Sequence, residues 1–259
     1  MYRLTYLLRR RDDVPFGEFQ RYWLEQHAPL VAGHADVLKI RRYIQVHTLG
    51  EPEENPEVAF RGSMMTPYDG VAELWFDHRD DVVSALGSPD GQAAGAELVE
   101  DESKFVDLEH SPAWFGYEAP QINPGPENIV ATPDSNIHKI FYALNQKSGQ
   151  SLDEAQLYWR MYHGPHVRKR GPVLGLMRYI QVHRLEDELN QAFADARGTT
   201  AAPFCGHAEL WQAAPGDGPA FGDDAVQAAK FLAEDESRFI DFARSAIWLG
   251  KEHVIVDKT

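Results

Sequence analysis

The chain has 259 residues, of which 43% are hydrophobic and 25% charged, a composition typical of globular proteins. The length corresponds to one large domain or two small ones. Its 25 Lys and Arg against 40 Asp and Glu give a net charge of −15, which argues against nucleic-acid and membrane partners. Cys205 is the single cysteine, and the N-terminal segment has no apolar run long enough for a signal peptide or a membrane span. We therefore expect a cytoplasmic protein.

The first part of the chain predicts six elements in order. Residues 3–8 are β-prone, and 15–26 place aromatic residues at helical spacing. Residues 38–47 and 71–76 alternate as strands, 91–107 are helical, and a last strand surrounds Trp114. The order β-α-β-β-α-β is that of the ferredoxin-like fold, of class α+β. Its helices lie on one side of the sheet and leave the other face bare.

The sequence contains an internal repeat. Residues 21–47 align with 157–183 at an offset of 136 without a gap, and G-x-A-E-L-W recurs at 70 and 206. The sequence E-D-E-S-x-F recurs at 100 and 234. This pattern predicts a tandem duplication, with repeat 1 at 1–118, a proline-rich linker at 119–136 and repeat 2 at 137–259. We expect the two bare sheet faces to pack together as an intrachain dimeric α/β-barrel, with a further homodimer left open.

Both repeats contain Y-W-x-x-x-H-x-P, followed by R-Y-I-Q-V-H and A-E-L-W. This combination resembles the EthD family of the dimeric α/β-barrel superfamily, over essentially the whole chain outside the linker. The resemblance implies two ferredoxin-like half-barrels with a ligand cavity between the sheets. It also implies that His27 and His163 act as acid or base. Related families include cofactor-free isomerases, lyases, polyketide cyclases and anthrone oxygenases, besides some haem-dependent enzymes.

Polar and apolar residues alternate along the two matching strands. Because a buried unpaired polar group costs about 1 to 3 kcal/mol, we expect one set to face the cavity or solvent: Tyr43, Gln45, His47, Tyr179, Gln181 and His183. The opposite set then faces the helices: Ile44, Val46, Ile180 and Val182. The same alternation turns four further residues inward: Glu73, Trp75, Glu209 and Trp211. Each of these glutamates can then orient an imidazole or, if desolvated, act as an acid. The alternative is a buried ion pair with Arg42 or Arg178.

The repeats differ where chemistry is expected. Tyr162, His166 and His207 of repeat 2 replace Gln26, Leu30 and Val71 of repeat 1. We therefore predict the working site in repeat 2, with His163 as principal acid or base, Tyr179 and His183 stabilising an oxyanion, and Glu209 and His207 beside them. The symmetric or substrate-binding positions are His27, Tyr43, His47, Glu73, Trp75, Tyr162, His166 and Trp211.

Other functional classes have little support. A metal site would use His163, His166, His183, His207 and Glu209, but the proline inside H-G-P-H turns the two rings apart, and no metal is predicted. No cofactor is predicted either, since C-x-x-C-H, G-x-G-x-x-G, Walker A and G-x-S-x-G are all absent from the sequence. Cys205 is interpreted as a buried or incidental thiol, and the acidic run 234–236 as a solvated helix face.

Two long insertions, 48–69 and 184–205, have the length of lids. Their apolar residues are candidates for the walls of a substrate site: Met64, Met65, Phe193 and Phe204.

These features favour a cofactor-independent lyase or isomerase that acts on a small aromatic or phenolic compound by histidine-centred acid–base catalysis, in aromatic catabolism. The alternatives are a cofactor-free oxygenase or polyketide-type cyclase or dehydratase, which begins with the same deprotonation, and a non-catalytic protein that binds a hydrophobic ligand. Oxygen consumption distinguishes the oxygenase. Affinity retained without turnover distinguishes the binding protein.

Overall fold

The structure is a computed structural model that describes residues 1–50, 60–125, 129–214 and 222–258. The first half contains β1 (Tyr2–Leu8), α1 (Phe16–Tyr22), η1 (Trp23–His27), α2 (Ala28–Gly33), β2 (Arg42–Thr48), β3 (Gly70–Phe76), α3 (Arg79–Gly87), α4 (Pro89–Glu102) and β4 (Ala113–Ile122). The second half contains β5 (Ile137–Leu144), α5 (Leu152–Tyr158), η3 (Trp159–His163), α6 (Gly164–Arg170), β6 (Leu176–Arg184), α7 (Glu188–Arg197), β7 (Gly206–Ala213), α8 (Asp223–Glu236), η4 (Phe242–Arg244) and β8 (Ala246–Asp257). The predicted α+β class and the strand order are confirmed.

The strands form one closed antiparallel barrel in the order β1-β3-β2-β8-β5-β7-β6-β4. The last strand of each half joins the two halves. β4 pairs first with β1 and then continues along β6, while β8 pairs with β5 and continues along β2. Each half thus contributes its last strand to the sheet of the other, and the intrachain barrel predicted from the duplication is confirmed.

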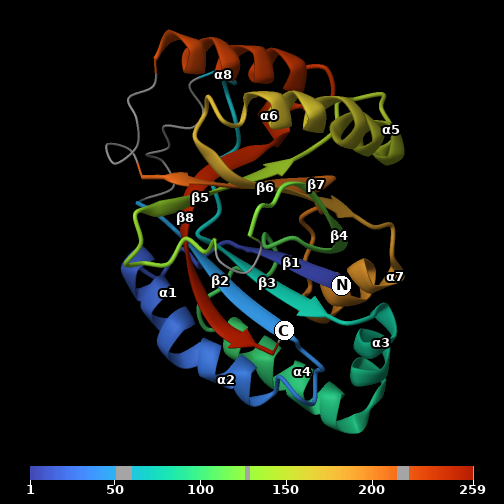
Figure 1. Ribbon diagram of the computed structural model, residues 1–259. Helices are drawn as coiled ribbons and strands as arrows, with labels where there is room; N and C mark the ends of the chain where they lie inside the picture. The colour runs from blue at the N-terminus through green and yellow to red at the C-terminus, as the bar shows by residue number, and fades with distance from the viewer. Residues whose placement is uncertain (51–59, 126–128, 215–221, 259) are drawn as a thin grey trace.

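The helices cover the outside of the barrel (Figure 1). α1, α2 and α4 lie over the sheet of the first half, and α5, α6 and α8 lie over the sheet of the second. The helical spacing of Phe19 and Trp23 explains this placement, because both side chains are buried in one core with the strand residues beneath them. Each strand therefore has two buried faces, one toward the helices and one toward the barrel interior.

The segment predicted as a linker is partly sheet. β4 runs through Ile122, so that Ala119 pairs with Gln181 across β6. Farther along, Ala131 and Glu252 of β8 exchange two hydrogen bonds of 2.7 Å. These contacts attach both ends of the segment to the barrel, rather than leaving it as a free spacer.

The second insertion is not an open lid loop, because 188–197 form α7. Asp187 caps its N-terminus by accepting from the Leu189 N–H at 3.0 Å, and Gly198 ends it in the left-handed conformation, with φ of 67°. The Phe115 N–H of β4 donates to Asn190 at 2.7 Å, which holds α7 against the first half. Of the first insertion, 51–59 lie outside the described residues.

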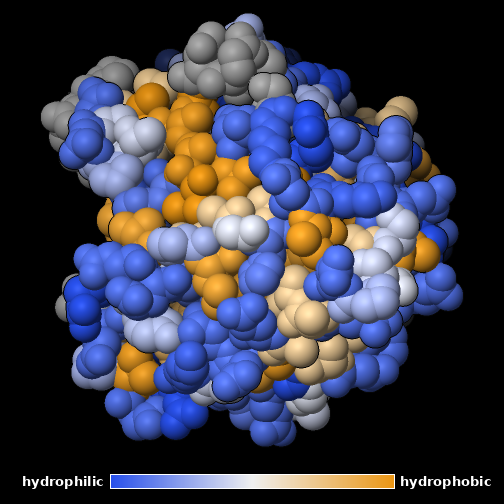
Figure 2. All heavy atoms as spheres, turned by 90° about the horizontal axis from the view of Figure 1, so that it is seen from below, coloured by the Kyte–Doolittle hydropathy of each residue, from blue (hydrophilic) through white to orange (hydrophobic). Residues whose placement is uncertain are grey.

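The outer surface is mixed in polarity. Seen from below, hydrophobic residues gather in the middle of the face and hydrophilic residues surround them (Figure 2). Within the described ranges, no helix has both the length and the apolar character needed to cross a membrane.

Candidate active site

The barrel interior is filled with side chains. Its apolar part consists of residues that alternate along the strands or enter from the ends: Leu7, Ile44, Val46, Tyr68, Val71, Trp75, Trp114, Phe141, Ala143, Phe204, Ala246 and Trp248. In the part of the chain that the structure describes, these side chains form one buried cluster between the two sheets. The predicted ligand cavity between the sheets is therefore wrong.

A cluster of charges lies on the same inner face. Arg3 and Lys139 occupy equivalent positions of the two copies, as do Glu73 and Glu209. Lys139 Nζ donates to Glu73 at 2.7 Å and to Glu252 at 3.1 Å, and Arg3 contacts both Glu73, at 2.9 Å, and Glu209. Each carboxylate therefore meets a basic group, which is the condition for tolerating buried charge.

The alternation correctly turns the glutamates and tryptophans inward. The predicted imidazole partner is found for Glu209, which contacts His207, but the alternative ion pair with Arg42 or Arg178 is wrong. Arg42 pairs with Asp257 at 3.7 Å instead of with Glu73 or Glu209. The tryptophans cover the buried cations: the Arg3 guanidinium lies 4.4 Å from the Trp75 ring, and Lys139 Nζ lies 4.9 Å from the Trp211 ring.

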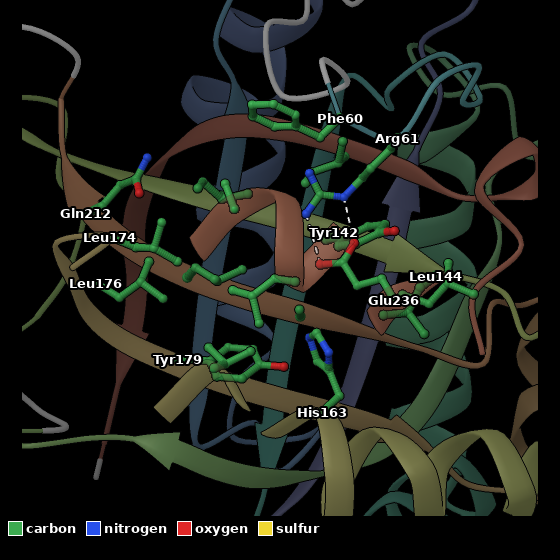
Figure 3. A pocket seen from close by; sticks show the side chains of 18 of the residues that line it. Phe60, Arg61, Tyr142, Leu144, His163, Leu174, Leu176, Tyr179, Gln212 and Glu236 are labelled. Carbon is green, nitrogen blue, oxygen red and sulfur yellow. Dashed lines mark hydrogen bonds and ion pairs between the residues drawn. The ribbon is translucent and has the colours of Figure 1, made fainter. Parts of the chain in front are cut away.

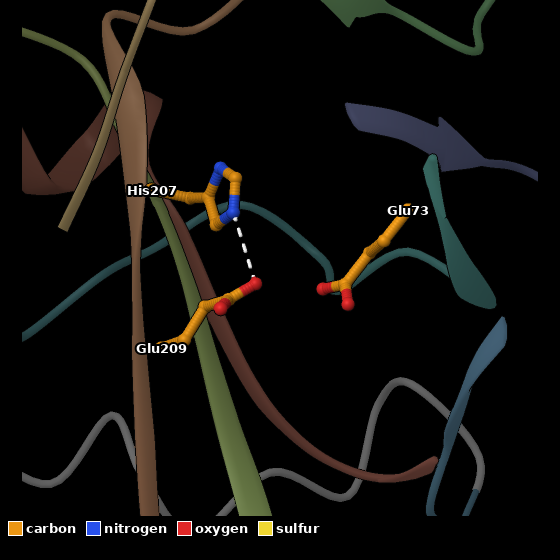
Figure 4. Close-up of side chains that lie close together, drawn as sticks. All are labelled: Glu73, His207 and Glu209. Atoms are coloured by element: carbon orange, nitrogen blue, oxygen red, sulfur yellow. Dashed lines mark hydrogen bonds and ion pairs between the residues drawn. The ribbon is translucent and has the colours of Figure 1, made fainter. Parts of the chain in front are cut away.

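His207 belongs to this cluster. Its Nε2 lies 3.2 Å from Glu209 (Figure 4). Its ring stacks on Phe141, with centroids 4.4 Å apart. Burial lowers the pKa of His207 to about 4, so the ring is neutral at pH 7. The ligand atoms of His207, Glu73 and Glu209 lie within 4.8 Å of one another, yet they do not fit a metal ion. Arg3 and Lys139 already bring positive charge to both carboxylates.

The two faces of β2 and β6 are the reverse of the prediction. The apolar set of β2 and β6 points into the barrel, and the polar set lies under the helices: Tyr43, Gln45 and His47, with Tyr179, Gln181 and His183. Local pairing explains the reversal. Gln45 Nε2 donates to the Tyr43 hydroxyl and to the Trp23 carbonyl, both at 2.9 Å, so burying this amide leaves no unpaired donor.

A pocket of about 320 Å³ lies between the sheet and the helices of the second half (Figure 3). Its walls are largely aliphatic: Ile140, Leu144, Val167, Leu174, Leu176, Ala208, Leu210 and Leu232. A few polar groups interrupt them, namely His163, Tyr142, Tyr179, Gln212 and the pair Arg61 and Glu236. A mostly apolar pocket with few convergent polar groups is the usual form of a small-molecule site.

His163 reaches this pocket from the end of η3, a π-helical turn. The turn forms because Pro165 has no N–H to continue the α-helical ladder, and the Gly164 N–H bonds to the carbonyl of Trp159, five residues back. His163 Nδ1 lies 2.8 Å from Asp235. Since an ionised carboxylate only accepts, Nδ1 carries the proton, and Nε2 is the nitrogen with a free lone pair.

Asp235 is ionised although it is buried. Burial would raise the pKa of Asp235, but hydrogen bonds from His163 and from the Tyr158 hydroxyl, the latter at 2.8 Å, hold it below its usual value. The carboxylate thus stabilises the imidazolium that forms when His163 accepts a proton. The interpretation of 234–236 as a solvated face is wrong for Asp235 and Glu236, which are both buried.

Tyr179 points its hydroxyl toward the His163 ring (Figure 3). Its oxygen accepts from Trp159 Nε1 at 3.0 Å and from Gln181 Nε2 at 3.1 Å. Because both partners are donors, the Tyr179 proton is left for another acceptor. Burial raises the pKa of Tyr179 above its usual range, so the hydroxyl keeps its proton and can donate to a substrate oxygen.

A residue of the first half completes the wall of the second-half pocket. Arg61, from the insertion of the first half, donates to Glu236 through Nε at 2.7 Å and Nη2 at 2.9 Å, and lies over the Tyr142 ring. Its equivalent in α7, Arg197, makes the same paired contact with Glu102 of the first half, at 2.7 and 2.8 Å. Each insertion therefore brings an arginine to the opposite half.

The other residues predicted for repeat 2 are dispersed. His183 lies between Trp159 and Tyr117, where burial lowers its pKa to about 3. His166 packs on Phe231, and Tyr162 is 58% exposed. The expected concentration of imidazoles, and with it the five-residue metal arrangement, is wrong: His207 and Glu209 lie on the inner face, across the sheet from His163.

The first half repeats the arrangement around a smaller pocket of about 130 Å³. His27 Nδ1 lies 2.9 Å from Asp101, which also accepts from the Tyr22 hydroxyl at 2.7 Å. His47 stacks on Trp23, and burial lowers the pKa of His47 to about 3. Of the predicted insertion residues, Phe193 lines this pocket, whereas Met64 packs beside the second-half core and Met65 is exposed.

Sequence reasoning missed the acidic partners and the exchanged arginines. The signal for Asp101 and Asp235 was the recurrence of E-D-E-S-x-F in both copies. The signal for Arg61 and Arg197 was their spacing of 136, the offset that also relates His27 to His163.

The sequence profile of the EthD domain matches residues 11–109 and 147–243. No curated protein matches the chain. Among solved structures, an EthD-family protein from Bacillus halodurans C-125 is 19% identical, over 46% of this chain and 99% of its own, with a TM-score of 0.33. An anthrone oxidase-like protein is 10% identical over 100% and 94%, with a TM-score of 0.49. A chlorite dismutase variant from Candidatus Nitrospira defluvii, in complex with cyanide, is 11% identical over 98% and 91%, with a TM-score of 0.40.

Proposed function

The chain belongs to the EthD family, with one copy of the domain in each half, and from this premise we propose a function for the pocket of the second half. The protein is a cofactor-independent lyase or isomerase that acts on a small aromatic or phenolic compound. One observation carries the proposal: the 2.8 Å contact between His163 Nδ1 and Asp235 leaves Nε2 as a base beside an apolar pocket of about 320 Å³.

In the proposed reaction, His163 Nε2 takes a proton from an acidic carbon or a phenolic oxygen of the substrate. Asp235 stabilises the resulting imidazolium, and Tyr179 donates a hydrogen bond to the oxyanion that develops. The imidazolium then returns the proton, to a different carbon in an isomerisation or to the leaving group in an elimination. Each group of this kind contributes about 10²- to 10⁴-fold to the rate.

The pocket supports a substrate of about two fused rings. A cavity of about 150 Å³ holds one benzene ring, and the volume of this pocket, about 320 Å³, is roughly twice that. Gln212 lies at the end away from His163, where its amide can bind a second polar substituent (Figure 3). The aliphatic walls exclude water from the reacting carbon.

Hydrogen–deuterium exchange into 2-tetralone tests this proposal. This compound has two fused rings and an acidic benzylic position beside a ketone, so it requires the proposed base without requiring the natural substrate. In D₂O, the protein should incorporate deuterium at that position faster than buffer does, as measured by mass spectrometry. The His163→Asn variant should lose most of this activity.

An oxygen electrode in the same sample separates the alternatives. Exchange without oxygen uptake supports the lyase or isomerase. Oxygen uptake that matches the loss of 2-tetralone would replace it with a cofactor-free oxygenase. Binding of 2-tetralone without exchange above the buffer rate would contradict acid–base catalysis and favour the non-catalytic binding protein.

A further inference from the structure

We infer that the pocket of the first half is a second binding site with a different capacity: it takes a single aromatic ring that carries one hydroxyl group. The pocket lies between the first-half sheet and its helices and has a volume of about 130 Å³. This is close to the roughly 150 Å³ that accommodates benzene. Its walls are largely aliphatic, including Leu4, Val31, Leu38, Ala72 and Leu98.

One wall of this pocket is equipped for a hydroxyl group. Asp101 accepts from His27 Nδ1 at 2.9 Å, so His27 Nε2 is left as an acceptor. The Tyr43 oxygen accepts from Gln45 at 2.9 Å, and burial raises the pKa of Tyr43, so its hydroxyl remains a donor. A phenolic hydroxyl can therefore donate to His27 and accept from Tyr43.

Three phenylalanines in the wall exclude a larger molecule. Phe76 stands where the second half has Gln212, and its ring packs against Phe115 with centroids 6.4 Å apart. Phe115 in turn aligns with Leu249. Phe193 of α7 closes the pocket further. The aromatic rings thus occupy the space that a second fused ring would need. The first half also has no amide at this position to bind a polar substituent on that ring.

Two other polar residues of this pocket, Glu102 and Arg197, already bind each other. Both oxygens of Glu102 accept from Arg197, at 2.7 and 2.8 Å, and the guanidinium lies 3.6 Å from the Phe193 ring. A ligand therefore gains hydrogen bonds at His27 and Tyr43, and the buried Tyr6 hydroxyl, which also lines the pocket and has no hydrogen-bond partner among the described residues, is a third polar contact. The two pockets thus differ in the largest ring system that they admit. This inference goes beyond the function proposed for the second half and does not depend on turnover there.

Nuclear magnetic resonance of the histidine rings tests this inference on the full chain. Long-range ¹H–¹⁵N spectra report each imidazole separately, and the His27→Asn and His163→Asn variants assign the two signals. Phenol should shift the signals of both His27 and His163 in a saturable manner. 2-Naphthol should shift the His163 signal alone.

Two pairs of matched substitutions, one substitution in each half, make the test independent of any single variant. Phe76→Gln should admit 2-naphthol to the first-half pocket, so that the His27 signal then responds to this compound. Gln212→Phe should weaken the effect of 2-naphthol on the His163 signal. Ala72 and Ala208 also occupy equivalent lining positions. Ala72→Leu should weaken phenol binding at His27 by about 10-fold and leave His163 unchanged, and Ala208→Leu should do the reverse.

The inference is overturned if phenol leaves the His27 signal unchanged, or if 2-naphthol shifts His27 and His163 equally in the unmodified protein. A His163 signal that responds to neither compound would instead contradict the proposed function of the second half. A His27 response to phenol would in that case still establish the second site.

Discussion

The two faces of the barrel sheet carry similar ionisable residues but leave them in opposite states. On the inner face, Glu209 contacts Arg3, Lys139 and His207, and the group is enclosed by packed rings. On the outer face, His163 contacts a carboxylate through one nitrogen and borders a pocket. Burial and perturbed pKa values occur on both faces. A free lone pair beside open space occurs with His163, and this feature separates a site for chemistry from a structural ion cluster.

The largest effect should come from the outer face. His163→Asn removes the proposed base, so the rate of deuterium exchange into 2-tetralone should fall by about 10²- to 10⁴-fold. His27→Asn is the matched control in the smaller pocket and should leave this rate nearly unchanged. Equal losses in the two variants would show that the halves share one function.

Mutation of the inner face should change stability instead. Lys139→Met leaves Glu73, Glu209 and Glu252 without one of their basic partners, and the free energy of unfolding in urea should fall by about 3 to 5 kcal/mol. Lys230→Met, at an exposed position, should change it by less than about 0.5 kcal/mol. If Lys139→Met were as stable as the unmodified protein, the charge cluster would not be a structural element.

The exchanged arginines should act across the two halves. Arg61→Ala leaves Glu236 without its paired contact, so 2-naphthol binding at His163 should weaken by about 10-fold, while phenol binding at His27 should not change. Arg197→Ala should have the opposite pattern. Titrations of the two histidine signals give both affinities from one sample. An effect of Arg61→Ala confined to His27 would contradict the crossed arrangement.

The last prediction concerns stability in acid. Burial lowers the pKa of His207 to about 4, below the usual 6.5. Above pH 6.5 neither state binds this proton. As the pH falls from 6.5 toward 4, the unfolded chain binds it and the folded chain does not, so stability falls by about 1.4 kcal/mol per pH unit from this group.

The His207→Val variant tests this, since it introduces the residue that the first copy has at Val71. Urea unfolding at pH 7, 6 and 5 should show a shallower loss of stability in the variant than in the unmodified protein. A difference between the two proteins that stays constant over this range would contradict the assignment to His207.

The repeat at an offset of 136 and the alternation of the strands were enough to predict much of the fold. They established two ferredoxin-like halves, their pairing in one barrel, and the placement of Glu73 and Glu209 on one face. They also singled out His163 and Tyr179. These properties follow from local sequence, because strand periodicity determines which residues share a face and a duplicated segment has to fold twice.

The tertiary structure alone decided which face holds the pocket. Both faces of each strand are buried, the outer one by helices and the inner one by the opposite sheet. Because Gln45 and Tyr43 pair with each other, polar residues can lie on either face, and the polarity pattern along the strand does not identify the outer face. Asp235 lies 72 residues from His163, and Glu236 lies 175 residues from Arg61. These contacts depend on how α8 and the first insertion pack on the barrel, and no local pattern records that packing.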